Sequence, residues 1–289
     1  MAEQLKNVYT KDYIRNLALN IKENYDEFDN DNFINSIFNP PWQELELKQR
    51  MRHIATTLNE YLPLSYKQQL EILKPSSKEF SGFEAMFFQD FVEVFGVDDF
   101  DSSINALEVF TQDSSSEFAI RQFILKYEDE TLEKMNQWIK SENEHLRRLA
   151  SEGCRPRLPW AVALPRFKEN PSKILKIIEK LKNDKSLYVR KSVANNLNDI
   201  SKDNPHLVIQ FVKENLGVSK ELDWLCKHAS RTLLKNGDKE ILKLFSFDKS
   251  SHVEIENFVC DTLVKVDDNL NFSFDLVSNE TLGNIRVEY

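Results

Sequence analysis

The chain has 289 residues, of which 41% are hydrophobic and 29% charged, and its formal net charge is −9, as in an ordinary soluble globular protein with a substantial core. No apolar run approaches the roughly 18 residues that cross a bilayer, the first ten residues lack the apolar core of a signal peptide, and Cys154, Cys226 and Cys260 lie too far apart for a metal-type pairing. We therefore expect a cytoplasmic protein with reduced thiols and no membrane partner.

The first 75 residues carry the pattern of several amphipathic helices. Residues 11–21 place apolar side chains at i, i+3, i+4 and i+7. Asp29 or Asn30 can cap a second helix, the Pro40-Pro41 pair ends it, and Trp42 is expected to begin a third.

Seven phenylalanines lie between residues 78 and 100. Their roughly helical spacing predicts core filling rather than a cofactor pocket. The segment SSSEFAIRQFILKY follows, and its serines are expected to cap a helix that carries Glu117 in its first turn. A carboxylate there suits the helix dipole.

From residue 141 onward one arrangement recurs. SENEHLRRLA, YVRKSVANNLNDI and WLCKHASRTLLKN share a pattern of apolar, basic and small residues, with Ala150, Ala194 and Ser230 in corresponding places. Paired helices that repeat at about 40 residues are typical of a HEAT-like solenoid. The pattern predicts an all-α fold, a HEAT-like repeat α-solenoid over residues 1–250.

Individual helix starts are also predicted in this region. Ser141–Glu144 has the sequence of a capping box. Asn170-Pro171 and Asn204-Pro205 each resemble an N-cap followed by proline at the first helical position. Residues 251–289 differ, because they are rich in Val, Phe and Ile that alternate with period two, as in residues 270–276. This pattern predicts a short β-rich tail of about three strands.

The charge is unevenly distributed. Residues 141–240 hold 20 Lys and Arg against 13 Asp and Glu, whereas the rest of the chain holds 18 against 34. A polyanion responds to local as well as total charge, so a basic surface on an acidic body is compatible with a nucleic-acid partner.

Two segments carry the residues of a candidate site. SEGCRPRLPW joins Glu152, Arg155, Arg157 and Trp160 at a turn between helices, and RKSVANNLNDISKD carries Asp199 on a helix. From the residues alone, an interhelical turn with solvated arginines is one interpretation. The other is a site where arginines contact phosphates and the indole contacts a sugar or base.

RRLASEGCRPRLPWA and VRKSVANNLNDISKDNP together resemble the AlkC branch of the HEAT-like-repeat DNA alkylation repair glycosylases, the AlkC/AlkD family, and EFAIRQF is similar to the preceding motif of that family. The resemblance implies a monofunctional DNA glycosylase that removes alkylated, cationic bases, 3-methyladenine above all, from duplex DNA, as a monomer and without a metal or other cofactor. It implies catalytic roles for Asp199, Glu152 and Glu117, and a substrate contact for Trp160.

Basic residues in the same region are the expected DNA contacts. They are Arg148, Arg155, Arg157, Arg166, Arg190, Lys191, Lys202, Lys227, His228 and Arg231. Many proteins of this branch carry a complete immunoglobulin-like domain after the repeats, and residues 251–289 match only its opening strands. We expect this partial domain to pack on the solenoid or to be poorly ordered, because unpaired strand edges favour aggregation. Alternatives are a noncatalytic HEAT-repeat protein that binds DNA damage and a protein-interaction scaffold.

Overall fold

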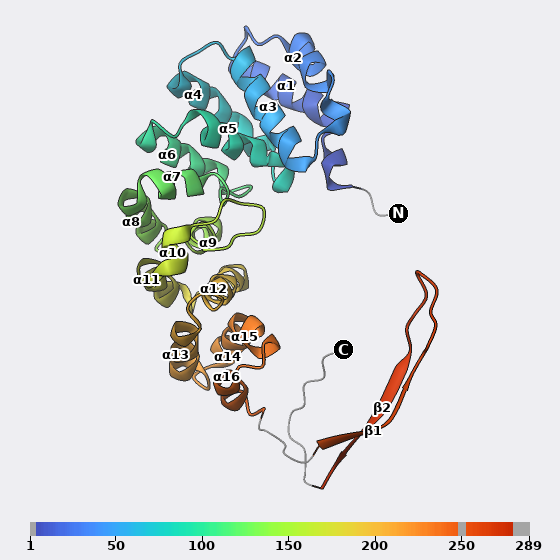
Figure 1. Ribbon diagram of the computed structural model, residues 1–289. Coiled ribbons are helices and arrows are strands. Elements are labelled where there is room, and N and C mark those ends of the chain that lie inside the picture. The colour runs from blue at the N-terminus through green and yellow to red at the C-terminus, as the bar shows by residue number, and fades with distance from the viewer. Residues whose placement is uncertain (1–3, 248–252, 280–289) are drawn as a thin grey trace.

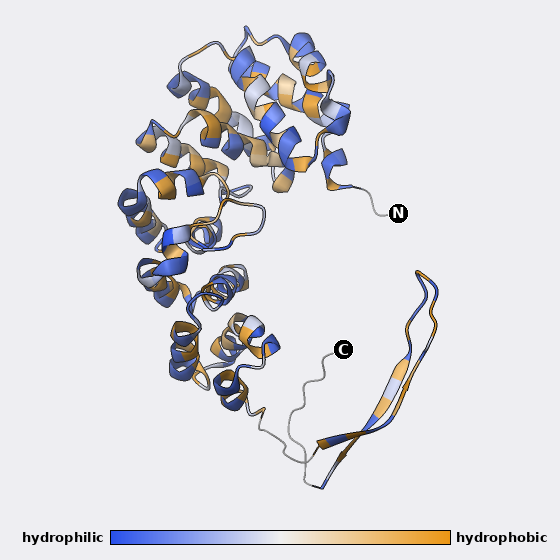
Figure 2. Ribbon diagram, in the orientation of Figure 1, coloured by the Kyte–Doolittle hydropathy of each residue, from blue (hydrophilic) through white to orange (hydrophobic). Residues whose placement is uncertain are grey.

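The computed structural model describes residues 4–247 and 253–279. Figure 1 shows a C-shaped stack of helices followed by a β-hairpin. Around most helices hydrophobic and hydrophilic positions alternate, as Figure 2 shows, so each helix has one apolar side to pack against its neighbours. None of the helices in these residues is long and apolar enough to span a membrane. The all-α repeat fold predicted for the main body is confirmed.

The N-terminal part packs around aromatic side chains. Phe87, Phe88 and Phe91 are buried, and the Phe87 and Phe88 ring centroids lie 4.4 Å apart. The predicted aromatic core is therefore present. This part contains α1 (Lys11–Asn24), α2 (Asn30–Phe38), α3 (Leu47–Tyr61), α4 (Tyr66–Ser76), α5 (Phe87–Phe95) and α6 (Phe100–Phe110), with 3-10 turns at Leu5–Val8, Trp42–Glu44, Ser77–Glu79 and Phe83–Met86.

The second part forms two rows of helices. In Figure 1, α8, α11 and α13 form the outer row, whereas α9, α12 and α14 form the inner row. The elements are α7 (Ile120–Lys126), α8 (Glu128–Trp138), α9 (Glu144–Glu152), α10 (Pro165–Glu169), α11 (Ser172–Leu181), α12 (Leu187–Ile200), α13 (Pro205–Asn215), α14 (Lys220–Ala229), α15 (Arg231–Lys235) and α16 (Lys239–Leu244).

The predicted repeat is visible in the packing of this part. The small residues Ala150, Ala194 and Ser230 are all fully buried, as expected where helices approach closely. Contacts between successive repeats recur at similar separations: Asn196 Nδ2 donates to the Ser151 carbonyl 45 residues earlier at 2.8 Å, and Asn204 Nδ2 donates to the Lys168 carbonyl 36 residues earlier at 2.6 Å.

Several predicted helix starts were wrong. Trp42 begins a 3-10 turn, and the following helix starts at Leu47, where the Glu46 and Gln49 side chains form a capping box. The expected box at Ser141–Glu144 is absent, because Asn143 caps α9 by accepting from the His145 amide at 2.8 Å.

Two further starts are displaced by a few residues. Pro171 was predicted to be the first residue of its helix, but it is the N-cap residue of α11, which begins at Ser172. Pro205 is the first residue of α13, as predicted. Glu117 is not in a first helical turn, because α7 begins at Ile120. The preceding turn is held by tertiary bonds, in which the Ser116 amide donates to Thr111 Oγ1 at 2.9 Å.

The described tail is a two-stranded antiparallel hairpin of β1 (Val253–Cys260) and β2 (Phe272–Ser278). The described residues thus hold two of the three predicted strands, and any strand in 280–289 lies outside them. The expected packing on the solenoid is not seen for the hairpin, since Ile255, Phe258 and Val259 are exposed and the hairpin extends away from the helices in Figure 1.

Candidate active site

A carboxylate–guanidinium cluster lies where α9 and α12 meet. Glu152 ends α9, Arg155 follows in the next turn, and Asp199 is in the last turn of α12. Arg155 Nη1 donates to Glu152 Oε1 at 2.6 Å, and Arg155 Nε donates to Asp199 Oδ2 at 2.9 Å. Residues from two motifs 44 positions apart are therefore joined by one guanidinium. The Asn196–Ser151 hydrogen bond fixes the register of the two helices beside it.

This cluster is almost completely shielded from solvent. Glu152 is 4% exposed, Arg155 7% and Asp199 1%. Burial alone would lower the pKa of Arg155, but the charges of Glu152 and Asp199 outweigh that effect and raise it. Removing one member of such a buried set leaves another charge unpaired, which is costly. The three side chains therefore depend on one another for their positions.

A second ion pair extends the cluster toward α7. Arg148, on α9, pairs with Glu117 through a short contact and reaches Glu152 with Nη2 at 3.6 Å. The Ser115 hydroxyl also donates to Glu117, and the Arg148 guanidinium lies 5.1 Å from the centre of the Tyr188 ring. Burial would lower the pKa of Arg148, but Glu117 and Glu152 raise it overall. Glu117 and Glu152 are thus linked through Arg148, as Glu152 and Asp199 are through Arg155.

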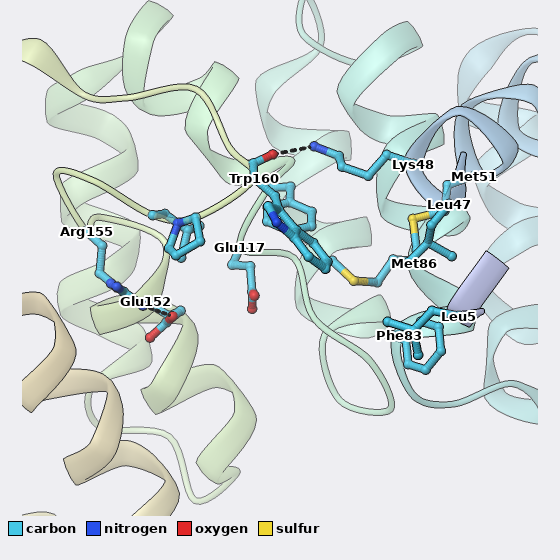
Figure 3. Close-up of a pocket in the computed structure, with 13 residues that line it drawn as sticks. Leu5, Leu47, Lys48, Met51, Phe83, Met86, Glu117, Glu152, Arg155 and Trp160 are labelled. Atoms are coloured by element: carbon cyan, nitrogen blue, oxygen red, sulfur yellow. Dashed lines mark hydrogen bonds and ion pairs between the residues drawn. The ribbon is translucent and has the colours of Figure 1, made fainter. Parts of the chain in front are cut away.

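Trp160 stands beside these carboxylates in a cavity of about 350 Å³. Figure 3 shows the indole between Glu117 and the apolar side chains of the N-terminal part, with Arg155 and Glu152 on the other side. The side chains of Met51, Met86 and Phe118 supply much of the apolar wall. Although Trp160 is large and apolar, it is 69% exposed, so a flat aromatic surface is presented next to buried acids.

Asp199 is connected to this cavity by its hydrogen bond with Arg155, whose side chain lines the cavity. Asp199 belongs to α12, which lies in the inner row of helices in Figure 1. Its second oxygen, Oδ1, faces Lys202 Nζ at 3.3 Å. The described residues contain no group of three or more His, Cys, Asp or Glu that could hold a metal ion.

The predicted DNA-contact residues divide by exposure. Lys191, Lys227 and Arg231 are exposed, whereas Arg155 is buried between two carboxylates. Arg157 is exposed but forms a two-pronged pair with Asp203 at 2.6 and 2.8 Å. An arginine whose guanidinium already pairs with a carboxylate of the protein is a weaker candidate for a phosphate contact than a basic residue without such a pair.

The remaining basic residues use their donors locally. Arg190 Nη1 donates to the Asp184 carbonyl at 2.6 Å, and His228 Nε2 lies 3.1 Å from Asn195 Oδ1 with its ring stacked on Trp224. Burial, with the nearby Arg231 and Lys191 charges, lowers the pKa of His228. Arg166 lies apart from this group and pairs at 3.3 Å with Glu128 of the outer helix α8.

Comparison with known proteins places these features in a family. The fold superimposes on Pseudomonas fluorescens alkylpurine DNA glycosylase AlkC, solved bound to DNA containing an abasic site analog, with a TM-score of 0.90 and 37% identity over 96% of this chain and 78% of that one. YhaZ of Bacillus subtilis, an uncharacterized protein, is 42% identical over 99% of this chain and 80% of its own length. The family of DNA alkylation repair enzymes matches residues 105–241.

The chain belongs to the AlkC branch of the DNA alkylation repair family. The segment that matches the family contains every predicted site residue, from Glu117 to Arg231. It excludes α1 to α5, although the cavity beside Trp160 is lined partly by α3. This AlkC-type protein therefore completes its candidate site with side chains from outside the matched segment.

Three residues at the site were not found from the sequence. Tyr188 packs beside Arg148, Lys48 Nζ donates to the Trp160 carbonyl at 2.7 Å, and Arg121 is fully buried beneath the turn that follows α9. Arg121 had a detectable signal, because a charged residue follows Ile120 and precedes Phe123 in the EFAIRQF motif. Lys48 had none, since it lies 112 residues from its partner.

Proposed function

We propose that this protein is a monofunctional DNA glycosylase that hydrolyses the N-glycosidic bond of alkylated, cationic bases in duplex DNA, with 3-methyladenine as the preferred substrate. The observation that carries the proposal is the set of acids, Glu117, Glu152 and Asp199, held by two arginines beside an exposed tryptophan. Membership of the AlkC branch supports it, because the Pseudomonas relative is an alkylpurine DNA glycosylase.

The chemistry of such a substrate matches this arrangement. Methylation of a ring nitrogen gives the base a positive charge, so the electrons of the breaking C1′–N bond neutralise the departing base and a strong general acid is not needed. The sugar becomes cationic as the bond breaks, and a nearby carboxylate stabilises that charge. Water then adds to C1′ and releases a proton, leaving an abasic site and a free base.

The residues divide this work by position. Asp199 stabilises the sugar cation and orients the attacking water, and Glu152 and Glu117 add negative charge around the same point. Trp160 packs its exposed face on the sugar. Arg155 differs from its predicted role as a phosphate contact: because its guanidinium is bonded to Glu152 and Asp199, we assign it to holding these carboxylates.

The exposed basic residues account for DNA binding in this proposal. Lys191, Lys227 and Arg231 are exposed and belong to the region with an excess of positive charge. Charges of this kind contact phosphates without reading sequence, and they release counterions when they do so. Arg157 and Lys202 are also exposed, but they pair with the carboxylates of Asp203 and Asp199.

One observation favours a noncatalytic protein that binds damaged DNA. Asp199 is only 1% exposed and is bonded to Arg155, as a purely structural aspartate would be. The two functions differ in their product, because a binding protein releases no base.

Release of bases is the test. Purified protein is incubated with methylated duplex DNA without added metal, and the supernatant is analysed by chromatography for 3-methyladenine, 7-methylguanine and 3-methylcytosine. The proposal expects free 3-methyladenine in excess of the other bases and of a protein-free control. Tight binding to the methylated duplex with no free base would instead establish the noncatalytic alternative.

A further inference from the structure

The turn between α9 and α10, residues 153–164, is held in an unusual backbone conformation. It carries both Arg155 and Trp160, yet it contains no helix or strand. Trp160 has a φ of +64°, a region that residues with a β-carbon adopt only where the surrounding structure fixes them. Other parts of the molecule must therefore determine where the indole stands.

Arg121 fixes the two ends of this turn from below. The side chain is 0% exposed, and its Nη1 donates to the carbonyls of Gly153 and Arg155 at 3.0 and 2.8 Å. Its Nε donates to the Val162 carbonyl at 2.6 Å. One planar guanidinium thus joins the start of the turn to the residue two places after Trp160. Burial lowers the pKa of Arg121 to about 10, which leaves the group charged at neutral pH.

Lys48 holds the turn from the opposite side. It projects from α3, where its Nζ donates to the Trp160 carbonyl at 2.7 Å and lies 4.4 Å from the centre of the Phe118 ring. Figure 3 shows this bond as a dashed line that joins Lys48 to the carbonyl of Trp160. Because this charge-assisted hydrogen bond is made to the carbonyl of Trp160 itself, it directly restrains the peptide plane that follows the residue with positive φ.

We propose that Lys48 and Arg121 are positioning residues that hold Trp160 in its place beside the carboxylates before DNA binds. The N-terminal helices, which lie outside the segment that matches the family, then take part in excision through Lys48. This inference rests on the proposed glycosylase function for its kinetic consequence. The anchoring itself is a property of the protein alone and can be measured without DNA.

The kinetic test is a double-mutant cycle between Lys48 and Trp160. Lys48→Met should lower the single-turnover rate of base release about tenfold, the effect of losing one charge-assisted hydrogen bond, while DNA affinity changes less than about twofold. Lys48→Arg, which keeps a cationic donor, should recover most of the rate. In a Trp160→Ala background Lys48→Met should have no further effect, because the side chain that it positions is gone.

The matched control is Lys22→Met. Lys22 Nζ also donates to a backbone carbonyl, that of Phe28, at 2.9 Å, but in the N-terminal helices away from the turn. The single-turnover rate of base release by Lys22→Met should equal that of the wild type. A tenfold effect of Lys48→Met that persists in the Trp160→Ala background overturns the proposal, and so does an unchanged rate in the single variant.

Hydrogen exchange tests the anchoring independently of activity. The amides of Arg155, Ala161 and Leu164 form hydrogen bonds in and beside the turn. Lys48→Met and Arg121→Lys should each speed their exchange by about tenfold or more, as expected when a local restraint is lost, and Lys22→Met should not. Arg121→Lys keeps the charge and removes the fork, so it probes geometry with less risk to folding than an apolar replacement.

The two measurements separate the two ideas. Faster exchange in a protein that releases no base from methylated DNA leaves the anchoring standing and removes the proposed function. Base release at an unchanged rate, with unchanged exchange in the Lys48 and Arg121 variants, keeps the function and overturns the anchoring.

Discussion

Replacing Asp199 by asparagine separates the proposed chemical role of this residue from its structural one. Asparagine has nearly the same shape and keeps an oxygen that can accept from Arg155 Nε, which lies 2.9 Å from the present carboxylate. Arg155 also retains its bond to Glu152 at 2.6 Å. The variant therefore loses a negative charge while much of the hydrogen-bonding geometry survives.

The structure allows the two costs to be compared. The fold should lose about 1–3 kcal/mol, because one charge-assisted bond becomes a neutral one in a buried site. Base excision should lose about 3–4 kcal/mol of transition-state stabilisation, which corresponds to a rate reduction of roughly a hundred- to a thousandfold. The loss of activity should thus far exceed what a slightly less stable but folded protein would show.

The assay is single-turnover release of 3-methyladenine with enzyme in excess, so that differences in affinity do not enter the rate. Thermal unfolding and binding to a duplex with an abasic-site analog are measured in parallel. Asp203→Asn is the matched control: this aspartate lies four residues further on and pairs with Arg157 at 2.6 Å, but it is exposed. Its rate should remain within about threefold of the wild type, since exposed pairs contribute little.

The result that refutes the reasoning is specific. If Asp199→Asn releases 3-methyladenine at the wild-type rate, the carboxylate does not stabilise the reacting sugar. If both aspartate variants lose the same factor, the effect comes from a general disturbance of the end of α12.

Three further outcomes follow from the same contacts. Trp160→Ala should lower the rate of base release roughly tenfold to a hundredfold, because stacking on a nucleotide contributes about 1–3 kcal/mol. Its thermal stability should be unchanged, because the indole is 69% exposed and supports no core. Single-turnover kinetics measures the first effect and calorimetry the second. Lys191→Ala and Arg231→Ala should each reduce the slope of log affinity against log salt by about one, and unchanged slopes would place these side chains away from DNA. Asp184→Asn should destabilise the fold by up to about 3 kcal/mol at pH 7, because it breaks the buried pair with Arg147. Burial opposes the ionisation of Asp184, but the bond from Arg147 outweighs it and lowers the pKa of Asp184. The stabilisation from this pair is therefore present above about pH 4 and is lost as the pH falls further. Denaturant unfolding should show that the stabilities of the wild type and of Asp184→Asn converge at low pH.

The parts of the fold that sequence predicted well are those set by local chemistry. Helix α12 is one, because its apolar positions and the following Asn204-Pro205 pair fix its end. The small residues that repeat in α9, α12 and after α14 are another, since close helix packing admits little else. The motifs predicted Glu152 at a turn between helices and Asp199 on a helix, and Arg155 joins these two residues in the structure.

The errors came from partners far away in the sequence. From the sequence, Arg155 was interpreted as a solvated or phosphate-binding arginine, because its partner Asp199 lies 44 positions later in the chain. Glu117 was predicted in the first turn of a helix, but it pairs with Arg148 in a turn held by Thr111. Composition cannot reveal whether an arginine faces a phosphate or an acid of its own protein, because the same guanidinium suits both.

Under the proposed function, the site must attract a polyanion and stabilise a cationic sugar, and the exposed basic residues and the buried acids lie at different depths. Lys191, Lys227 and Arg231 are exposed, while Glu152 and Asp199 are buried. Exposed charges act through a Debye length of about 8 Å at physiological salt and are screened beyond it. Buried charges are screened much less, so the acids should act on the bound sugar almost independently of salt.

This separation predicts different salt responses for binding and for chemistry. Raising salt from about 50 to 200 mM should weaken DNA affinity by at least an order of magnitude if several phosphates are contacted. The single-turnover rate at saturating protein should change by less than about twofold over the same range. Fluorescence anisotropy gives the first quantity and chromatography of the released base the second. A rate that falls in parallel with affinity would mean that the exposed cations act in the chemical step itself, and that charge is not partitioned by depth in this protein.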